Sequence, residues 1–349
     1  MPSDGTRSES WKKRVLRSMP APAWLGPDSP QGDVVVSTRF RYARNLRGIP
    51  FPHHCTTEQA MLVSQAVAEA GRSAGLLPQG RLTEAERDYL LGSRLISSDF
   101  EPRKPGRDVL LDAARTLSVM VNEEDHLRIQ ALVGGWSPQT ARIAADECLR
   151  VFDSRLNFAY AEPWGYLTAS EFNCGGAGRW SALFHFIGLA HRRRLQPLLR
   201  ALGSGGVTAR GLFGESSRAV GAFFQVSTTR LSLPEFMGAC ELLLRQEREA
   251  RAEVPRNELR ERFRQAVETA ESSAELDLRE ALRILAWVRW ASSVGLEGAP
   301  AHTRQVDESV STMEVFGTQD PAIAARHRAE FVRQRLGDSW RTLRNPGRA

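Results

Sequence analysis

The strand signals of this chain all lie before about residue 250, and only helical periodicity follows them. Short runs rich in β-branched and other apolar residues, which are typical of strands, occupy residues 33–40, 109–121, 166–169, 207–213 and 222–227. After about residue 252, apolar residues recur at helical spacing, at 278–294 and 322–336. This asymmetry predicts the α+β fold class, with a mixed domain followed by a smaller all-α domain.

Helical spacing also occurs between the predicted strands, at residues 58–75, 139–158, 181–190 and 234–251. The first thirty residues are polar and interrupted by proline and glycine, so we expect an irregular leader. A length of 349 residues fits two domains, at roughly 100–200 residues each. The predicted division is a leader at 1–30, a mixed domain at 31–252 and a helical domain at 253–349.

Positive charge is the unusual feature of the composition. Lys and Arg together number 47 against 41 acidic residues, a net charge of +6, and 44 of the basic residues are arginines. A nucleic-acid-binding protein concentrates such charge in a stripe or run. Here the arginines are dispersed among acids, so the sequence argues against a nucleic-acid partner.

The cysteines and the apolar segments restrict the compartment. The cysteines, at 55, 148, 174 and 240, are too far apart for a paired metal motif and suit a reducing cytoplasm. No apolar run approaches the roughly 18 residues that a membrane span needs, and the first residues lack the apolar core of a signal peptide. We therefore predict a cytoplasmic protein without membrane contact.

Two segments place charge where a buried strand would not tolerate it. In the first predicted strand, Arg39 and Arg41 are two residues apart and therefore share one face. Two adjacent guanidiniums suit an anion such as phosphate, although both could simply face solvent. Glu123, Glu124 and Asp125 follow another predicted strand. They could bind a cation, accept a proton or clamp a cationic substrate, or they could form an ordinary acidic loop before a helix.

Two glycine-containing segments also carry arginine. Residues 173–178 form a glycine loop before Arg179 and the helix predicted at 181–190, an arrangement that can attract anions. Arg210 precedes two glycines and Glu215. Each pattern is weak alone. Together, separated arginines and a cluster of carboxylates fit phosphoryl transfer, which depends on positioning and charge neutralisation. A guanidinium acceptor would explain the acids, because it must be held and deprotonated.

Four stretches, in order, resemble the ATP:guanido phosphotransferase (phosphagen kinase) family, and most closely its bacterial protein arginine kinase branch. They are VVVSTRFRYARNLRGIPFP, LSVMVNEEDHLRIQ, GYLTASEFNCGGAGRWSA and RGLFGESSRAVGAFFQVS. The resemblance runs from about residue 24 to 251 and continues more weakly to about 336. It implies a catalytic domain built on a mainly antiparallel β-sheet flanked by helices, followed by an all-α domain for dimerisation or regulation.

The resemblance also implies roles for individual residues. Glu123 and Glu124 would hold the acceptor guanidinium, with Glu124 as the base, and Glu215 would help position substrate or metal. Mg²⁺ would arrive with ATP, bound mainly by phosphates and water. Arg94 stands where the branch often has a nucleotide-contacting histidine. The ATP site would comprise Ser37, Thr38, Arg39, Phe40, Arg41, Arg94, Arg128, Arg179, Trp180, Ser181, Ala182, Leu183, Arg210, Gly211, Leu212, Phe213, Gly214 and Glu215.

The choice of branch rests on the start of the Ser-Thr-Arg-x-Arg motif at Ser37. Small-molecule guanidino kinases have a helical domain before this motif, and we expect none here. The resemblance then implies protein substrates that present arginine, an activator protein, a Clp-type protease that degrades the marked proteins, and a homodimer.

Two departures from the family pattern support an alternative. Ser170 stands in place of a family cysteine that contacts the acceptor, and residues 324–329 keep only the Arg-Ala end of a phosphoarginine-binding motif. The leading hypothesis is an active protein arginine kinase. The alternatives are a catalytically weak homologue that regulates by binding nucleotide or partners, and, less favoured, a kinase of small guanidino compounds.

Overall fold

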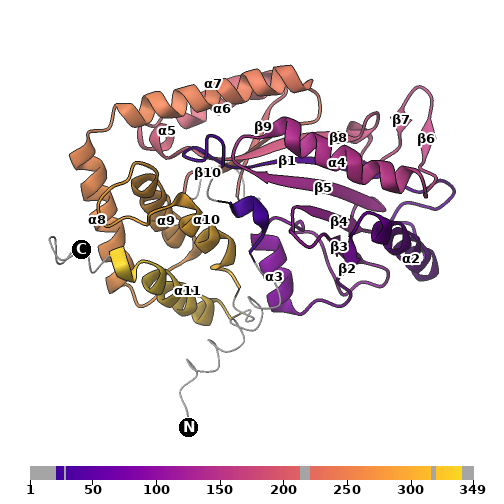
Figure 1. The fold of residues 1–349 in the computed structure, drawn as a ribbon, viewed down its shortest axis with the longest axis horizontal. Helices are drawn as coiled ribbons and strands as arrows, with labels where there is room; N and C mark the ends of the chain where they lie inside the picture. Colours follow the sequence, from indigo (N-terminus) through magenta and orange to yellow (C-terminus); the bar gives the residue numbers. More distant parts are fainter. Residues whose placement is uncertain (1–20, 27–28, 213–220, 316–319, 340–349) are drawn as a thin grey trace, which may run out of the picture.

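A computed structural model describes residues 21–26, 29–212, 221–315 and 320–339 of the chain. Its centre is an eight-stranded sheet in which every neighbouring pair is antiparallel (Figure 1). In spatial order the strands are β2 (Leu77–Pro78), β3 (Asp108–Leu111), β4 (Leu117–Val121), β5 (Leu127–Gly134), β1 (Val35–Arg44), β8 (Gly178–His185), β10 (Phe223–Thr228) and β9 (Thr208–Gly211). The α+β class and the antiparallel sheet predicted from the sequence are confirmed.

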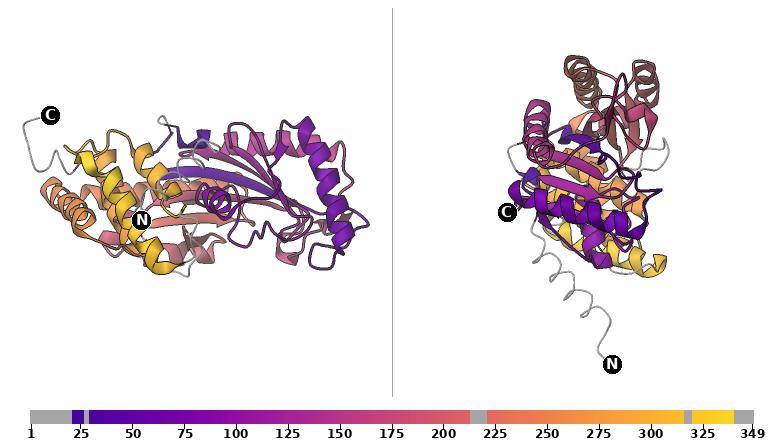
Figure 2. Two further views of the ribbon diagram at one scale, coloured as in Figure 1. Left: turned by 90° about the horizontal axis from the view of Figure 1, so that it is seen from below. Right: turned by 90° about the vertical axis from the view of Figure 1, so that its right-hand side faces the viewer.

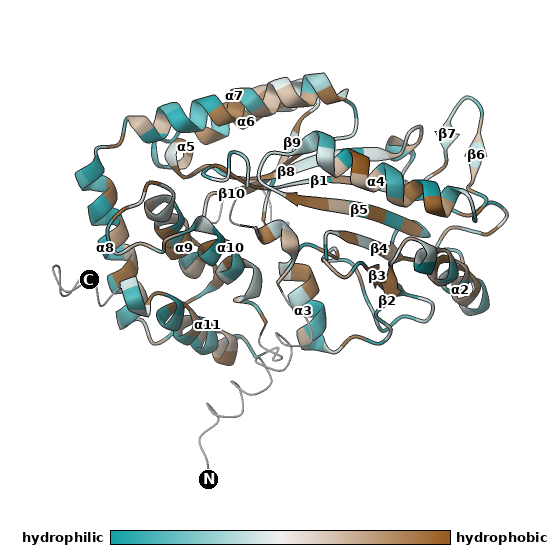
Figure 3. Ribbon diagram, in the orientation of Figure 1, coloured by the Kyte–Doolittle hydropathy of each residue, from teal (hydrophilic) through white to brown (hydrophobic). Residues whose placement is uncertain are grey.

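The central strands alternate between an apolar face and a more polar face. On the apolar face, Phe40, Ile129, Ala182 and Val226 belong to one buried core with residues of the helices that cover it. These helices are α2 (Thr57–Ser73), α4 (Pro138–Asp153), α6 (Leu195–Ser204) and α7 (Leu233–Ala252). Figure 3 shows hydrophobic residues along β3 and β5 and hydrophilic ones on the outer side of α2. The opposite face of these strands is mixed: it carries polar side chains such as Arg39, Gln130 and Gln225, and also Leu132, Leu183 and Phe223, which pack under other helices.

The remaining helices cover the other side and one end of the sheet. They are α3 (Glu84–Gly92), α5 (Ile187–His191), α8 (Arg256–Ser272), α9 (Leu278–Ser293), α10 (Thr303–Thr312) and α11 (Pro321–Arg335). Figure 2 shows α8–α11 grouped at one end of an elongated molecule. Their core includes Trp24, Leu132, Leu183 and Phe223, so these helices pack directly onto the sheet and onto the first described residues. No strand follows residue 252 among the described residues, as the periodicity predicts, and the exact domain limits stay predictions.

A buried, ion-paired arginine joins the C-terminal helices to the residues before β1 by hydrogen bonds. Arg289 of α9 is almost fully buried, and its Nε lies 2.7 Å from Oδ1 of Asp307. The same guanidinium donates hydrogen bonds of 2.8 Å to the backbone oxygens of Gly32 and Asp33. On α7, Glu247 accepts hydrogen bonds from the amides of α5 and pairs with Arg251 at 2.6 Å. Because each charge has partners, this polar network can be buried.

The helix predicted at residues 181–190 is wrong. These residues form the end of β8 and then the short helix α5. Ser181 and Leu183 face one side of the sheet while Ala182 and Phe184 face the helical layer, and all four are buried. A strand that is covered on both faces reads as a continuous apolar run, so its alternation is hidden in the sequence. Arg179 therefore lies within a strand and not at a helix N-terminus.

Within the parts of the chain that the structure describes, no helix is both long enough and apolar enough to span a bilayer.

Candidate active site

Strand register gathers the predicted arginines on the polar face of the sheet. Arg41 lies opposite Gln130 of β5 on one side and opposite Arg179 of β8 on the other. Residues directly opposite one another in antiparallel strands point to the same face, so these three side chains emerge together. Arg39 is two residues earlier and shares that face. The first strand thus places two guanidiniums at the centre of the sheet.

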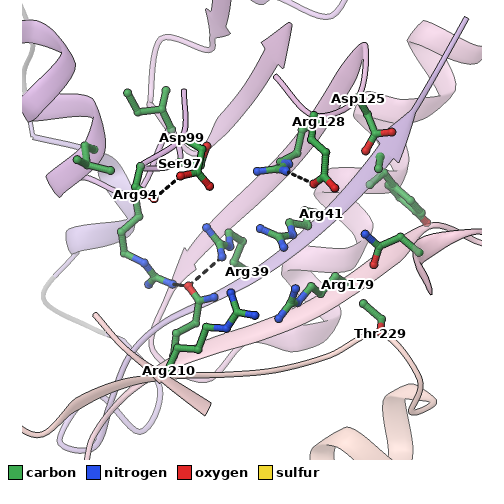
Figure 4. A pocket seen from close by; sticks show the side chains of 18 of the residues that line it. Arg39, Arg41, Arg94, Ser97, Asp99, Asp125, Arg128, Arg179, Arg210 and Thr229 are labelled. Atoms are coloured by element: carbon green, nitrogen blue, oxygen red, sulfur yellow. Dashed lines mark hydrogen bonds and ion pairs between the residues drawn. The ribbon is translucent and has the colours of Figure 1, made fainter. Parts of the chain in front are cut away.

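These guanidiniums line a cavity of about 400 Å³. Figure 4 shows the side chains of Arg39, Arg41, Arg94, Arg128, Arg179 and Arg210 directed toward a common space. The predicted site residues that line this cavity are Arg39, Arg41, Arg94, Glu124, Arg128, Arg179, Arg210, Gly211 and Leu212. Asp99 and Asp125 also line the cavity. The cavity therefore combines many positive charges with few carboxylates, and this charge balance suits a polyanionic ligand.

Neutral side chains hold the central guanidinium. Arg39 donates from Nε to Oγ of Ser181 at 3.1 Å and from Nη1 to Oε1 of Gln130 at 3.4 Å. Its Nη2 donates to Oε1 of Gln225 at 2.9 Å. Amide and hydroxyl oxygens fix the orientation of a guanidinium without cancelling its charge. The cavity therefore keeps its positive potential, and the guanidinium of Arg39 has a fixed orientation.

Arg94 adds a further guanidinium from the turn after α3. Its backbone has a φ of 62°, a left-handed conformation that is uncommon for a residue with a side chain. Its guanidinium donates to Oγ of Ser37 and, at 3.3 Å, to the same Gln225 oxygen that holds Arg39. Burial lowers the pKa of Arg94 to about 10. Ser37 therefore acts on the cavity through Arg94 and does not line it.

Burial, together with the crowding of like charges, lowers the pKa values of three arginines of the cavity. Burial and the neighbouring guanidiniums, Arg41 first among them, hold the pKa of Arg39 well below its usual range. Burial and the guanidiniums of Arg128 and Arg179 do the same for Arg41. Burial and Arg210 lower the pKa of Arg179. Each shift means that burial and like charges disfavour the charged form, so an anion that binds among these guanidiniums interacts favourably with every one of them.

The acidic residues lie at the other end of β5. Arg128 is 2.6 Å from an oxygen of Glu123 and 3.2 Å from Oε2 of Glu124. Glu123 also accepts a 2.6 Å hydrogen bond from Oγ of Ser97, and its side chain is nearly buried. The side chain of Glu124 is 41% exposed and lines the cavity. Of the two glutamates, Glu124 is the one that an acceptor can reach.

The acidic turn is held by buried hydrogen bonds. Asp125 accepts from Nδ2 of Asn45 at 2.6 Å and from the amide of Ala169 at 2.7 Å. His126 accepts at Nδ1 from the amide of Leu46 at 3.0 Å, and its Nε2 lies 2.9 Å from the oxygen of Pro50. Because Nδ1 accepts, Nε2 must carry the proton, and the imidazole is neutral. Burial lowers the pKa of His126 to about 4, which agrees with this assignment.

Several residues predicted for the site do not reach the cavity wall. Phe40, Trp180 and Ala182 lie in the core on the apolar face, and Leu183 belongs to the core under the C-terminal helices. Thr38 donates to the oxygen of Gly135. Glu123, Ser181 and Ser170 are not among the lining residues, although the first two bond to residues that are. Phe213, Gly214 and Glu215 lie outside the described residues.

Sequence reasoning missed Gln130, Gln225, Ser97 and Asn45. Gln130 lies two residues after Arg128 in the same strand, so strand alternation alone could have placed it beside the arginines. Gln225 required the register of β10, which the sequence does not reveal.

The described residues contain no cluster of three His, Cys, Asp or Glu side chains that could hold a metal ion. The carboxylates of the cavity lie among guanidiniums and do not form a separate cage.

Comparison with known proteins agrees with this geometry. The catalytic-domain profile of the ATP:guanido phosphotransferases matches residues 58–237. A protein-arginine kinase of Moorella thermoacetica is 36% identical over 338 residues, covering 90% of this chain and 97% of the relative. A protein-arginine kinase of Shouchella clausii is 32% identical, covering 93% of this chain and 97% of the relative.

Solved structures show the same fold at low sequence identity. The duplicated taurocyamine kinase of Schistosoma mansoni superimposes with a TM-score of 0.57 at 23% identity, over 66% of this chain. This chain spans only 36% of that duplicated protein. A lombricine kinase gives a TM-score of 0.53 at 19% identity, over 70% of this chain and 78% of the other. The fold, the sequence profile and the long alignments agree, and this chain belongs to the ATP:guanido phosphotransferase family.

Proposed function

We propose that this chain is a protein arginine kinase, which transfers the γ-phosphoryl group of ATP to a guanidino nitrogen of arginine residues in proteins. The observation that carries the proposal is the single cavity in which six guanidiniums lie beside the exposed carboxylate of Glu124. The two relatives named protein-arginine kinase, each aligned over nearly its whole length, support the protein substrate.

The arginines supply most of the catalysis. Arg39, Arg41, Arg94, Arg179 and Arg210 line the cavity and would bind the phosphates of ATP. The orientation of Arg39 does not depend on ATP, since Ser181 and the two glutamines hold its guanidinium. Phosphoryl transfer develops charge on the transferred group, and donors that need no rearrangement stabilise that charge best.

Glu124 would prepare the acceptor. A protonated guanidinium has no free lone pair for attack, so one nitrogen must lose its proton as the nitrogen–phosphorus bond forms. Glu124 would accept this proton while the bond between the γ-phosphorus and ADP breaks. Arg128 contacts both Glu123 and Glu124, so it fixes the acidic turn relative to the phosphate end of the cavity.

Magnesium would enter with the nucleotide. Mg²⁺ usually binds through substrate phosphates, water and one or two carboxylates. The cavity offers Asp99 as such a carboxylate, since Glu124 would be engaged with the acceptor, and Glu215 is a further candidate outside the described residues. Bound in this way, the ion would add to the charge neutralisation that the arginines provide.

Phosphorylation of an arginine-rich protein tests the proposal. The protein is incubated with Mg-ATP, and acid-labile phosphoarginine is detected by mass spectrometry at neutral pH. We expect label from the wild-type protein and a fall of about a hundredfold or more for Glu124→Gln, with ATP affinity retained. ATP binding without phosphoarginine would favour the regulatory homologue that the Ser170 replacement suggests. Label on free arginine alone would favour a small-molecule kinase.

The family resemblance adds finer proposals about partners and location. These are a cytoplasmic protein, a homodimer, an activator protein, and delivery of phosphorylated substrates to a Clp-type protease. Light scattering tests the dimer, and degradation of a phosphorylated substrate by a purified Clp protease tests the delivery.

A further inference from the structure

A second cavity adjoins the acceptor end of the first. It has a volume of about 340 Å³ and is lined by Phe40 and Trp180, which face away from Arg39 and Arg41, and by residues of the segment 173–178. The residues that line both cavities are Tyr42, Asn173, Ala177, Gly178 and Thr229. Figure 4 shows Asp125 and Thr229 on the same side of the first cavity. A chain whose arginine enters the first cavity from this side would therefore pass over the second.

The second cavity is lined by aromatic side chains and flanked by exposed ones. Tyr42, Tyr166 and Trp180 form part of its wall, and Phe172 lines it while remaining 77% exposed. Tyr160 and Trp164, on the hairpin of β6 (Tyr160–Ala161) and β7 (Gly165–Tyr166), are 53% and 66% exposed. Among the described residues, these three are the only large aromatic side chains that are exposed. Exposed aromatics gathered in one place are typical of polypeptide-binding surfaces.

One wall of this cavity carries a buried cation that forms no ion pair with the described residues; Asp153 attracts it only from beyond ion-pair distance. Arg44 is only 2% exposed, and its guanidinium stacks 3.7 Å from the ring centre of Tyr166. Its Nη1 donates to the backbone oxygens of Ala43 and Gly176, at 2.7 and 3.2 Å. Its Nε has no hydrogen-bond partner, and no carboxylate of the described residues lies within ion-pair distance. The other arginine of the cavity, Arg142, is already paired with Asp146 at 2.7 Å.

A buried charge of this kind is costly unless an anion accompanies it. The aromatic walls exclude water and strengthen any charge pair formed there. The cavity therefore fits a small anionic group that is carried on an otherwise apolar or extended chain, such as a carboxylate side chain. Glutamate or aspartate near the target arginine of a substrate protein has this chemistry.

We propose that the second cavity is a substrate subsite, which binds an acidic side chain of the protein substrate a few residues from the target arginine. Arg44 pairs with that carboxylate, and Phe172 and Trp164 contact the backbone of the substrate on either side. This inference rests on the proposed function, since it assumes that a protein arginine enters the first cavity.

A matched peptide series tests the subsite. Each peptide contains one arginine, with Glu, Gln or Lys at the flanking positions, and a further peptide carries the Glu at a distant position. The kcat/KM for phosphoarginine formation is measured at saturating Mg-ATP. For the wild-type protein we expect flanking Glu to exceed flanking Gln by about tenfold, because one partly desolvated ion pair is gained. The distant Glu should give only the small, salt-sensitive increase that the general positive charge of the site produces.

Two variants and one control locate the effect. Arg44→Met should remove the difference between flanking Glu and Gln, and Phe172→Ala should raise KM for all flanked peptides with kcat unchanged. Phe172 is exposed, so its truncation leaves the fold intact even if Arg44→Met reduces stability. Leu77→Ala is the control, because Leu77 is 62% exposed at the far edge of the sheet and should change nothing.

The outcomes separate the subsite from the function. If the wild-type protein phosphorylates no peptide and no protein, the proposed function is wrong. If it phosphorylates the Glu, Gln and Lys peptides with equal kcat/KM, the function stands and the subsite is wrong. A preference for Glu that persists in Arg44→Met, or a KM that Phe172→Ala leaves unchanged, would also overturn the assignment.

Discussion

Replacing Gln225 with glutamate inserts one negative charge into the phosphate cavity at a known place. The Gln225 oxygen lies 2.9 Å from Arg39 and 3.3 Å from Arg94, so a glutamate would form ion pairs with both. Two guanidiniums would keep it ionised. A phosphate on the other side of Arg39 would then lie about 6 Å from the carboxylate, where two unit charges repel by about 3 kcal/mol at an effective dielectric of about 20.

That repulsion corresponds to roughly a hundredfold weaker binding of Mg-ATP by Gln225→Glu. Titration calorimetry measures the Kd, and thermal unfolding verifies that the variant is folded. Gln225→Met is the matched control, because it loses the acceptor without adding charge and should cost only about 1 kcal/mol. If folded Gln225→Glu binds Mg-ATP with a Kd within a few-fold of the wild-type value, nucleotide binding does not require neutral hydrogen-bond partners for Arg39, and the reasoning is refuted.

Two further predictions concern stability. Arg289→Leu leaves Asp307 buried without its partner, so it should lower the free energy of unfolding by about 3–5 kcal/mol in urea titrations. Arg283→Leu, on the same helix, is the control and should lower it far less. Equal losses in the two variants would contradict this account. His126 has a folded-state pKa of about 4, below its unfolded value, so its contribution to stability is complete above about pH 6.5 and is lost as the pH falls toward 4. Between pH 7 and pH 5 the wild-type protein should lose about 2 kcal/mol more than His126→Gln does, and parallel curves for the two proteins would show that this histidine does not titrate as described.

The helices and strands that could be predicted are those in which the spacing of apolar residues along the sequence shows which face is buried. The helices α4 and α7 have one buried stripe, α9 has a long apolar run at helical spacing, and β1, β3 and β4 are short runs rich in apolar and β-branched residues. Strand β8 was mistaken for a helix because both of its faces are covered. Whether a prediction was correct depended on whether one face or both faces of the element are buried. Burial of the second face depends on residues that are far away in the sequence.

The residues of the candidate site also fall into two groups, those that the sequence identifies and those that only the structure identifies. Its arginines and glutamates could be identified from motifs, because charge in a strand is unusual. Gln225 and Arg44 could not, since one depends on strand register and the other on stacking against Tyr166. Strand alternation places Arg44 on the opposite face from Arg41, but nothing in the local sequence shows which side chain it packs against.

The contact of Arg289 with the residues before β1 has a consequence for synthesis on the ribosome. The chain emerges from its N-terminus, yet the guanidinium that bonds to the oxygen of Asp33 is 256 residues further along. During translation, the strand that carries Arg39 and Arg41 therefore lacks this anchor until α9 has been made. A nascent chain stalled before residue 289 should consequently expose the start of β1 to proteases and chaperones, and completion of the last helices should remove that exposure.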